Sequence, residues 1–267
     1  MTTGELQPTE AERHNLYLDE IRSPSTVAAR RILPLLLERF EINSVLDVGC
    51  GTGAWLAVAR EMGANRLTGV DATWAEDWLD EDGMIGSRDF DFVEHDLRER
   101  LKLDDRFDLA MSLEVAQHFT DARAASFVED LCATAPRVLF SSAVPLQYPP
   151  LESIMINNRW QSYWAGHFAD CGYLPMDVIR PVIWNDDVIP DYYRQNMLVY
   201  VTESEHDARL EPMMLDVVHP SCWDRRAVEA LDAKKPRRLG LRARLRIAGG
   251  IPRETARAAK RRWNARD

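Results

Sequence analysis

The stretch Ser44-Val-Leu-Asp-Val-Gly-Cys-Gly-Thr-Gly-Ala-Trp55 decides how the rest of this sequence is interpreted. Residues 44–48 form a short apolar run with β-branched members, which predicts a strand. Residues 49–53 place glycine at every second position and predict a tight turn, and apolar residues at helical spacing over 54–62 predict a helix. Glycine lets a backbone approach a ligand closely, and the N–H groups at a helix start are free to face one. Together these elements predict a cofactor site.

Asp47, at the end of the predicted strand, distinguishes between cofactor classes. Gly49-x-Gly51-x-x-Ala54 also matches the loose dinucleotide fingerprint, but that match alone is weak. A carboxylate at this point repels a pyrophosphate and attracts a ligand with a cationic end. S-adenosylmethionine (SAM) carries an ammonium and a sulfonium and no phosphate. Asp47 therefore favours SAM over an NAD-type cofactor or a glycine turn without a ligand.

Residues 46–53, Leu-Asp-Val-Gly-Cys-Gly-Thr-Gly, resemble the first motif of the class I SAM-dependent methyltransferases. The resemblance implies an α/β, Rossmann-like fold, with a seven-stranded, mostly parallel sheet in the order 3-2-1-4-5-7-6. It also implies that strand 7 is antiparallel and that helices cover both faces. The residue pattern predicts strands at about 44–48, 66–70, 90–94, 107–113, 137–141, 174–180 and 196–201. It predicts helices that start near Pro24 and at 54–62, 121–133 and 158–171, with residues 181–195 as a connection.

Charge is distributed unevenly along the 267 residues, whose net charge is −10. Residues 234–267 hold 13 Lys and Arg against 2 acidic residues, so the remainder carries a net charge of −21. We expect a flexible segment at 1–22, a methyltransferase domain at 23–202, an acidic extension at 203–233 and a basic tail at 234–267. The acidic body disfavours nucleic acid as a partner. The tail suits either an anionic membrane surface or an acidic surface of the protein itself or of a second subunit.

Composition bounds the class of protein. Hydrophobic residues make up 46% and charged residues 28%, which is ordinary for a globular protein. Four scattered cysteines, an N-terminus without signal-peptide regions and no apolar run of membrane-spanning length predict a cytoplasmic location. No His or Cys cluster has metal-ligand spacing, so we expect no metal. The alternative is Mg²⁺ held by Asp186, Asp187 and Asp191, since magnesium prefers oxygen ligands.

Acidic residues follow the second and third predicted strands as well. Asp71 comes 22 residues after Gly49, near the interval of about 20 at which an acid contacts a ribose diol. The resemblance places Asp96 and Leu97 around the adenine. The cofactor contacts expected from the residues and the resemblance are Asp47, Gly49, Cys50, Gly51, Gly53, Asp71, Ala72, Asp96, Leu97, Leu113 and Glu114.

Glu114-x-x-Gln117-His118 resembles the Glu-x-x-Glu-His segment that is frequent after the family's fourth strand, with Gln117 in place of the second acid. A hydroxyl acceptor must lose a proton during methylation, and His is the usual base near pH 7. His118 is the first candidate for that base, because it lies just past the fourth strand. His167 is the second. A local hydrogen bond or a surface position is the alternative for each.

Aromatic residues concentrate in residues 148–200, beside Asn, Arg and Gln. Aromatic faces next to amides and guanidinium groups suit a polyhydroxylated ring, whereas core packing explains part of the same pattern. We expect the acceptor to contact Trp160, Tyr163, Trp164, Tyr192, Tyr193, Arg194 and Gln195.

The last third of the predicted core resembles, more loosely, bacterial methyltransferases of surface-polysaccharide and glycoside pathways. We therefore expect an O-methyltransferase that uses SAM to methylate a sugar or glycosylated small molecule. Two alternatives stay open: an N- or C-methyltransferase of another small metabolite, and a SAM-binding protein without turnover. The expected partner is a small molecule or saccharide, and the sequence leaves membrane contact and a homodimer undecided.

Overall fold

The structure is a computed structural model that describes residues 10–73, 75, 90–147, 155–210 and 213–234, with side chains from residue 24 to 228. The chain divides into two units, residues 1–223 and 224–267, and the first contains the fold. The predicted basic tail lies outside the described residues, except for its first residue. Among the described residues, no helix is both long and apolar enough to cross a membrane.

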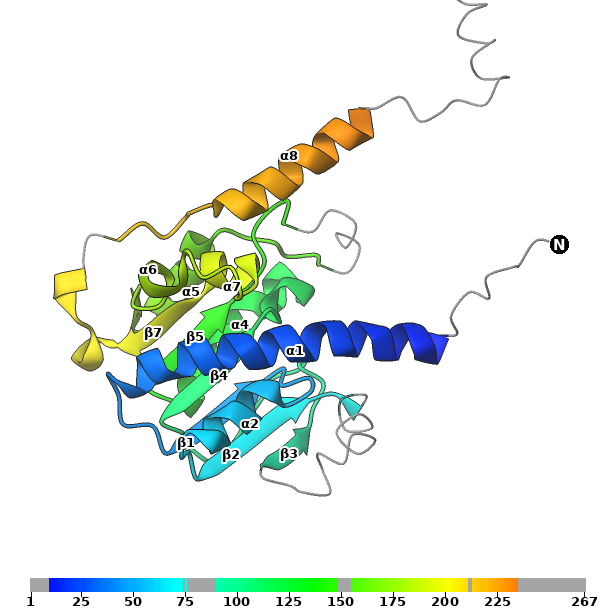
Figure 1. The fold of residues 1–267 in the computed structure, drawn as a ribbon. Helices are drawn as coiled ribbons and strands as arrows, with labels where there is room; N and C mark the ends of the chain where they lie inside the picture. The colour runs from blue at the N-terminus through cyan, green and yellow to red at the C-terminus, as the bar shows by residue number, and fades with distance from the viewer. Residues whose placement is uncertain (1–9, 74, 76–89, 148–154, 211–212, 235–267) are drawn as a thin grey trace, which may run out of the picture. The chain divides into compact units, whose positions relative to one another are not determined.

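A seven-stranded sheet in the order β3-β2-β1-β4-β5-β7-β6 forms the centre of the first unit (Figure 1). Strands β1 to β5 pair in parallel, and β7 pairs antiparallel with both β5 and β6. The predicted fold class and strand order are therefore confirmed. The strands are β1 (Ser44–Val48), β2 (Arg66–Asp71), β3 (Asp91–Glu94), β4 (Leu109–Leu113), β5 (Arg137–Ser141), β6 (Tyr173–Met176) and β7 (Leu198–Thr202).

Helices cover both faces of the sheet, as Figure 1 shows for the long α1 and for α4. Successive strand residues point to opposite faces. Val45 accordingly packs in one apolar cluster with α1 and α2, whereas Leu46 packs in another with α4 and α5. The helices are α1 (Glu10–Leu37), α2 (Ala54–Glu61), α4 (Asp121–Thr134), α5 (Gln161–Asp170), α6 (Arg180–Ile183), α7 (Asp191–Asn196) and α8 (Pro220–Lys234), with 3₁₀ turns η1 (Ala116–His118), η3 (Glu203–Glu205) and η4 (Ala208–Leu210).

Two local predictions were wrong. The first helix begins at Glu10 instead of near Pro24, which lies inside it together with Pro34. Proline lacks the N–H that continues a helix, yet α1 runs through both prolines, and its buried Ile32 and Leu36 pack against α2. The connection expected at residues 181–195 includes α6 and α7, and β6 ends at Met176, four residues early. Buried side chains of both short helices join the core under α1.

The segment expected as an acidic extension is hydrogen-bonded to the sheet's helices. Arg180 Nη2 donates to the carbonyl of Met214 at 2.7 Å, and Ser162 Oγ donates to Asp216 Oδ2 at 2.7 Å. The backbone N–H of His219 donates to Gln195 Oε1 at 2.8 Å. Residues 214–219 are therefore held against α5, α6 and α7.

Candidate active site

The glycine turn is closed by a carboxylate from the neighbouring strand. The backbone N–H of Gly51 donates to Asp71 Oδ2 at 2.8 Å, and the N–H of Ala72 donates to Asp71 Oδ1 at 2.8 Å. Gly49 has a φ of 86°, and a Cβ there would lie 2.3 Å from Val115 Cγ2. The turn therefore requires glycine at residue 49, and its backbone passes directly beside the segment that follows β4.

Asp47 is buried at the end of β1, with only 3% of its surface exposed. Burial raises the pKa of its carboxyl to about 8, and the negative charge of Asp71 adds to the rise. A buried acid of this kind is neutral near pH 7 unless a cation pairs with it. The chemistry of this position therefore fits a cationic group, whose charge would draw the proton off the acid.

The turn after β3 lies beside the ends of β1 and β2. The backbone N–H of His95 donates to the carbonyl of Asp71 at 2.8 Å, and Leu97 packs with Val48 and Val70 at the ends of β1 and β2. Asp96, which is expected to contact adenine, pairs with Arg98, whose Nη2 lies 2.6 Å from Asp96 Oδ2. These contacts lower the pKa of Asp96 to about 2.

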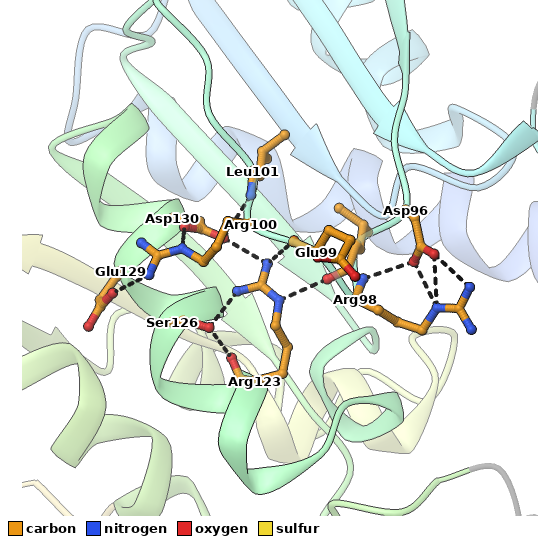
Figure 2. A network of polar contacts seen from close by, with 10 residues as sticks. Asp96, Arg98, Glu99, Arg100, Leu101, Arg123, Ser126, Glu129 and Asp130 are labelled. Atoms are coloured by element: carbon orange, nitrogen blue, oxygen red, sulfur yellow. Dashed lines mark hydrogen bonds and ion pairs between the residues drawn. The ribbon is translucent and has the colours of Figure 1, made fainter.

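A buried ion pair on α4 fixes the rest of that turn, as Figure 2 shows. Arg123 Nε donates to the carbonyl of Leu97 at 3.0 Å, and its Nη2 donates to Asp130 Oδ2 at 2.7 Å and to the carbonyl of Glu99 at 2.7 Å. The N–H of Leu101 donates to Asp130 Oδ2 at 3.0 Å. Three backbone groups of the turn are thus held by two side chains of one helix.

The end of β4 carries a second perturbed acid, Glu114. Its Oε1 accepts a hydrogen bond from Asn196 Nδ2 at 3.2 Å, and its Oε2 accepts one from Gln147 Nε2 at 3.5 Å. Burial raises the pKa of Glu114 to about 7, and these hydrogen bonds oppose the rise. Because β4 pairs with β1, this carboxyl lies at the same edge of the sheet as Asp47.

Gln117, which replaces the second acid of the resembled motif, forms hydrogen bonds at this edge of the sheet. Its Nε2 donates to the carbonyl of Glu114 at 2.7 Å, and its Oε1 accepts hydrogen bonds from Ser142 Oγ at 3.1 Å and from the N–H of Ala143 at 3.3 Å. A glutamate carboxylate at this position could accept but not donate, because it has no donor. Glutamine at this position therefore joins the segments that follow β4 and β5.

Comparison with known proteins assigns the family. Residues 18–172, more than half of the chain, match a family described as "Methyltransferase domain". The chain belongs to this methyltransferase family. It is thus a SAM-dependent methyltransferase with SAM as its cofactor, which confirms those two predictions. A search of curated proteins found no significant match.

Solved methyltransferases share the fold. An O-methyltransferase family protein from Burkholderia thailandensis is 15% identical with a TM-score of 0.53, and the match covers 72% of this chain and 60% of that one. DesVI from Streptomyces venezuelae is 14% identical with a TM-score of 0.55, over 74% and 100% of the two chains. Magnesium protoporphyrin IX methyltransferase from Synechocystis, with bound SAH, is 17% identical with a TM-score of 0.50, over 75% and 90%. At these identities the likeness concerns the fold alone.

The remaining predicted cofactor contacts of this methyltransferase lie at the ends of β1 to β4. Cys50 is buried, and Gly53 takes a φ of 67° as the N-cap of α2. Leu113 ends β4 directly before Glu114. The structure thus brings the predicted set to one edge of the sheet, while each residue's contact with SAM stays a prediction.

The two candidate histidines occupy different elements of the methyltransferase. His118 is exposed at the end of η1, four residues beyond Glu114. His167 lies on α5, where its ring packs edge-on against Tyr163 with 4.7 Å between centroids. The Tyr163 hydroxyl donates to Asp121 Oδ1 at 2.9 Å, so this pair faces the start of α4.

The predicted acceptor contacts fall into two groups. Trp160, Tyr163 and Trp164 belong to the start of α5, and Trp164 is fully buried against Phe140. The others lie on α7, on the opposite face of the sheet; Tyr193, Arg194 and Gln195 are buried there and Tyr192 is half-buried. One hydrogen bond links the groups, from Gln161 Nε2 to the carbonyl of Gln195 at 3.2 Å.

Two polar residues of this edge, Gln147 and Asn196, were not among the predicted site residues. Both are buried, at 3% and 2% exposure, and both donate to Glu114. The signal available in the sequence was their placement: Asn196 comes directly before an apolar strand, and Gln147 lies in a proline-rich connection. A buried polar side chain at such a place needs a hydrogen-bond partner.

Proposed function

We propose that this methyltransferase transfers a methyl group from SAM to a hydroxyl of a sugar or glycosylated small molecule. The observation that carries the proposal is the hydrogen bond between Gln161 and Gln195. It joins the start of α5, where the Trp160 indole is 39% exposed, to the amide-rich end of α7. An accessible aromatic face suits stacking against a ring with hydroxyl groups, whereas Gln161 and Gln195 are themselves buried.

The cofactor has a proposed binding mode built from residues of this chain. Asp47 pairs with the ammonium of the amino-acid end, Asp71 accepts hydrogen bonds from the ribose hydroxyls, and Leu97 packs on the adenine. The backbone of residues 49–53 provides the close approach. Bound SAM supplies an electrophilic methyl group on a sulfonium. Positioning by the protein then accounts for much of the acceleration.

The proton of a hydroxyl acceptor needs a receiving group. His118 and His167 are the proposals from the sequence, and the carboxyl of Glu114 is a third candidate. Removing the proton leaves the acceptor oxygen with the electron pair that the new O–C bond requires. An N-methyltransferase needs less help of this kind, so the identity of the acceptor decides how much the base matters.

An acceptor screen tests the proposed function. Purified protein is incubated with methyl-labelled SAM and with panels of sugars, glycosides, glycolipids, amines and phenols, and label transfer is counted. We expect transfer to saccharide hydroxyls. Label on amines or carbon instead replaces O-methylation with the alternative enzyme class. Binding of SAM without transfer to any panel favours the non-catalytic alternative.

Residues 234–267 are proposed as a separate partner-binding segment, either on an anionic membrane or on an acidic protein surface. Sedimentation of the full chain and of a chain ending at residue 233 with anionic vesicles, at low and moderate salt, separates the two. If the full chain binds the vesicles in a salt-sensitive way and the truncated chain does not, the result supports a membrane as the partner of the tail. Equal weak binding by both, with a lowered melting temperature after truncation, supports the intramolecular or subunit contact.

A further inference from the structure

Glu114 has a strained backbone at the edge of the sheet. Its φ is 59°, in the left-handed region that residues other than glycine rarely occupy. Its N–H donates to the carbonyl of Ser141 at 3.0 Å, so the strand ends of β4 and β5 hold this conformation in place. Strain of this kind is kept where the surrounding structure requires one direction for a side chain.

The carboxyl of Glu114 is held by two amides that come from different parts of the chain. Asn196 at the end of α7 donates to one oxygen, and Gln147 after β5 donates to the other. Asn196 Nδ2 also donates to Gln147 Oε1 at 2.9 Å, and Gln195 Nε2 donates to Asn196 Oδ1 at 2.9 Å. The amides are buried while the acid is half-buried.

Tyr193 connects this carboxyl to the cofactor side. Burial raises the pKa of the Tyr193 phenol to about 12, and the negative charges of Glu114 and Asp47 both add to the rise. The Tyr193 hydroxyl lies 3.4 Å from Ser25 Oγ, and its ring packs edge-on against Trp55 of α2. Glu114 thus lies within electrostatic range of the same tyrosine as the acid proposed for the amino-acid end of SAM.

We infer that Glu114 is the catalytic residue that receives the proton of the acceptor hydroxyl, with Asn196 and Gln147 as positioning residues. This inference rests on the proposed O-methylation. The O–H bond of the acceptor breaks, the proton moves to a carboxylate oxygen of Glu114, and the electron pair stays on the acceptor oxygen. This catalytic role for Glu114 takes the place of the cofactor contact that the resemblance implies for it. It also makes Glu114, and not His118 or His167, the proposed base.

The test compares Glu114→Gln, His118→Ala and the wild type on an acceptor found in the screen. For Glu114→Gln we expect kcat to fall by about 10²–10⁴-fold, with the Kd for SAM within about threefold of the wild type. The rise of kcat/KM with pH through about 7 should disappear in Glu114→Gln. The same rise should persist in His118→Ala.

A second variant keeps the test decisive if Glu114→Gln does not fold. Asn196→Ala removes a hydrogen bond that lowers the pKa of Glu114, so the acidic limb of the pH profile should move to higher pH. A limb that stays in place contradicts the positioning role, because a structural defect lowers the rate without moving the limb.

Two outcomes overturn the inference while the proposed function stands. One is a Glu114→Gln enzyme within tenfold of the wild-type kcat with its acidic limb intact. The other is loss of that limb in His118→Ala, which assigns the base to the histidine. Failure of the proposed function looks different, because the wild type itself then transfers no label to any hydroxyl.

Discussion

Asp71 at the end of β2 accepts a hydrogen bond from the backbone N–H of Gly51, 2.8 Å away in the turn after β1. This contact makes the acid part of the glycine turn as well as a proposed ribose ligand. Burial raises the pKa of Asp71, and the hydrogen bonds from Gly51 and Ala72 oppose the rise. One carboxylate therefore shapes the turn and faces the nucleoside side of the proposed site.

Asp71→Ala is expected to weaken SAM binding by about 1–3 kcal/mol, because charged hydrogen bonds to the ribose are lost. Isothermal calorimetry measures the Kd. Asp91→Ala, an exposed acid at the start of β3, is the matched control and should bind SAM like the wild type. An unchanged Kd in Asp71→Ala assigns the acid to turn structure alone.

SAM binding is expected to release a proton near pH 7. Asp47 has a pKa of about 8 in the free protein, so its carboxyl is mostly protonated at pH 7. Pairing with an ammonium lowers that pKa and drives the proton off. Calorimetry in phosphate and in Tris should give different binding enthalpies for the wild type and equal ones for Asp47→Asn. Equal enthalpies in the wild type contradict the proposed ammonium partner.

The same acid makes the free protein less stable as pH rises. The pKa of Asp47 is raised from an ordinary value near 4 to about 8 in the folded state. Its contribution to stability is full below the unfolded pKa and is lost as pH rises through the folded one. The Tm of the wild type should fall relative to that of Asp47→Asn as the pH rises from about 4 to about 8. If the two proteins show the same dependence of Tm on pH, Asp47 is not the cause of the loss of stability.

Arg123→Ala is expected to destabilise the fold by about 3–5 kcal/mol, since it leaves the buried carboxylate of Asp130 with one fewer cation. Its loss also frees the carbonyls of Leu97 and Glu99, so SAM affinity should fall as well. Thermal unfolding and SAM titration measure both effects. Arg209→Ala removes an exposed ion pair with Asp207 and should change stability by less than about 0.5 kcal/mol.

The Arg123→Ala protein could be destabilised and still bind SAM with wild-type affinity when it is measured well below its Tm. That outcome would show that the turn after β3 does not contribute to SAM binding. In that case the ion pair serves the fold alone, and the adenine contacts proposed for the turn after β3 lose their support.

The order of the strands in the sheet came from the resemblance to the class I methyltransferases. The sequence by itself determined the positions of the strands, the cofactor class and the acids that follow the first three strands. These features depend on local patterns, namely apolar runs, glycines that permit a close approach, and a carboxylate where a phosphate is disfavoured. Such signals lie within a few residues of one another, so reading them requires no knowledge of distant contacts. The positions of Asp47 and Asp71 followed from the same patterns.

Only the tertiary structure decided which side chains meet. Asn196 reaches Glu114 across 82 residues of sequence, and Arg123 reaches the carbonyl of Leu97 from a separate helix. It also showed that α1 runs through Pro24 and Pro34, against the local preference of proline. Burial, pKa and backbone strain depend on what packs around a residue, and that packing exists only once the chain is folded.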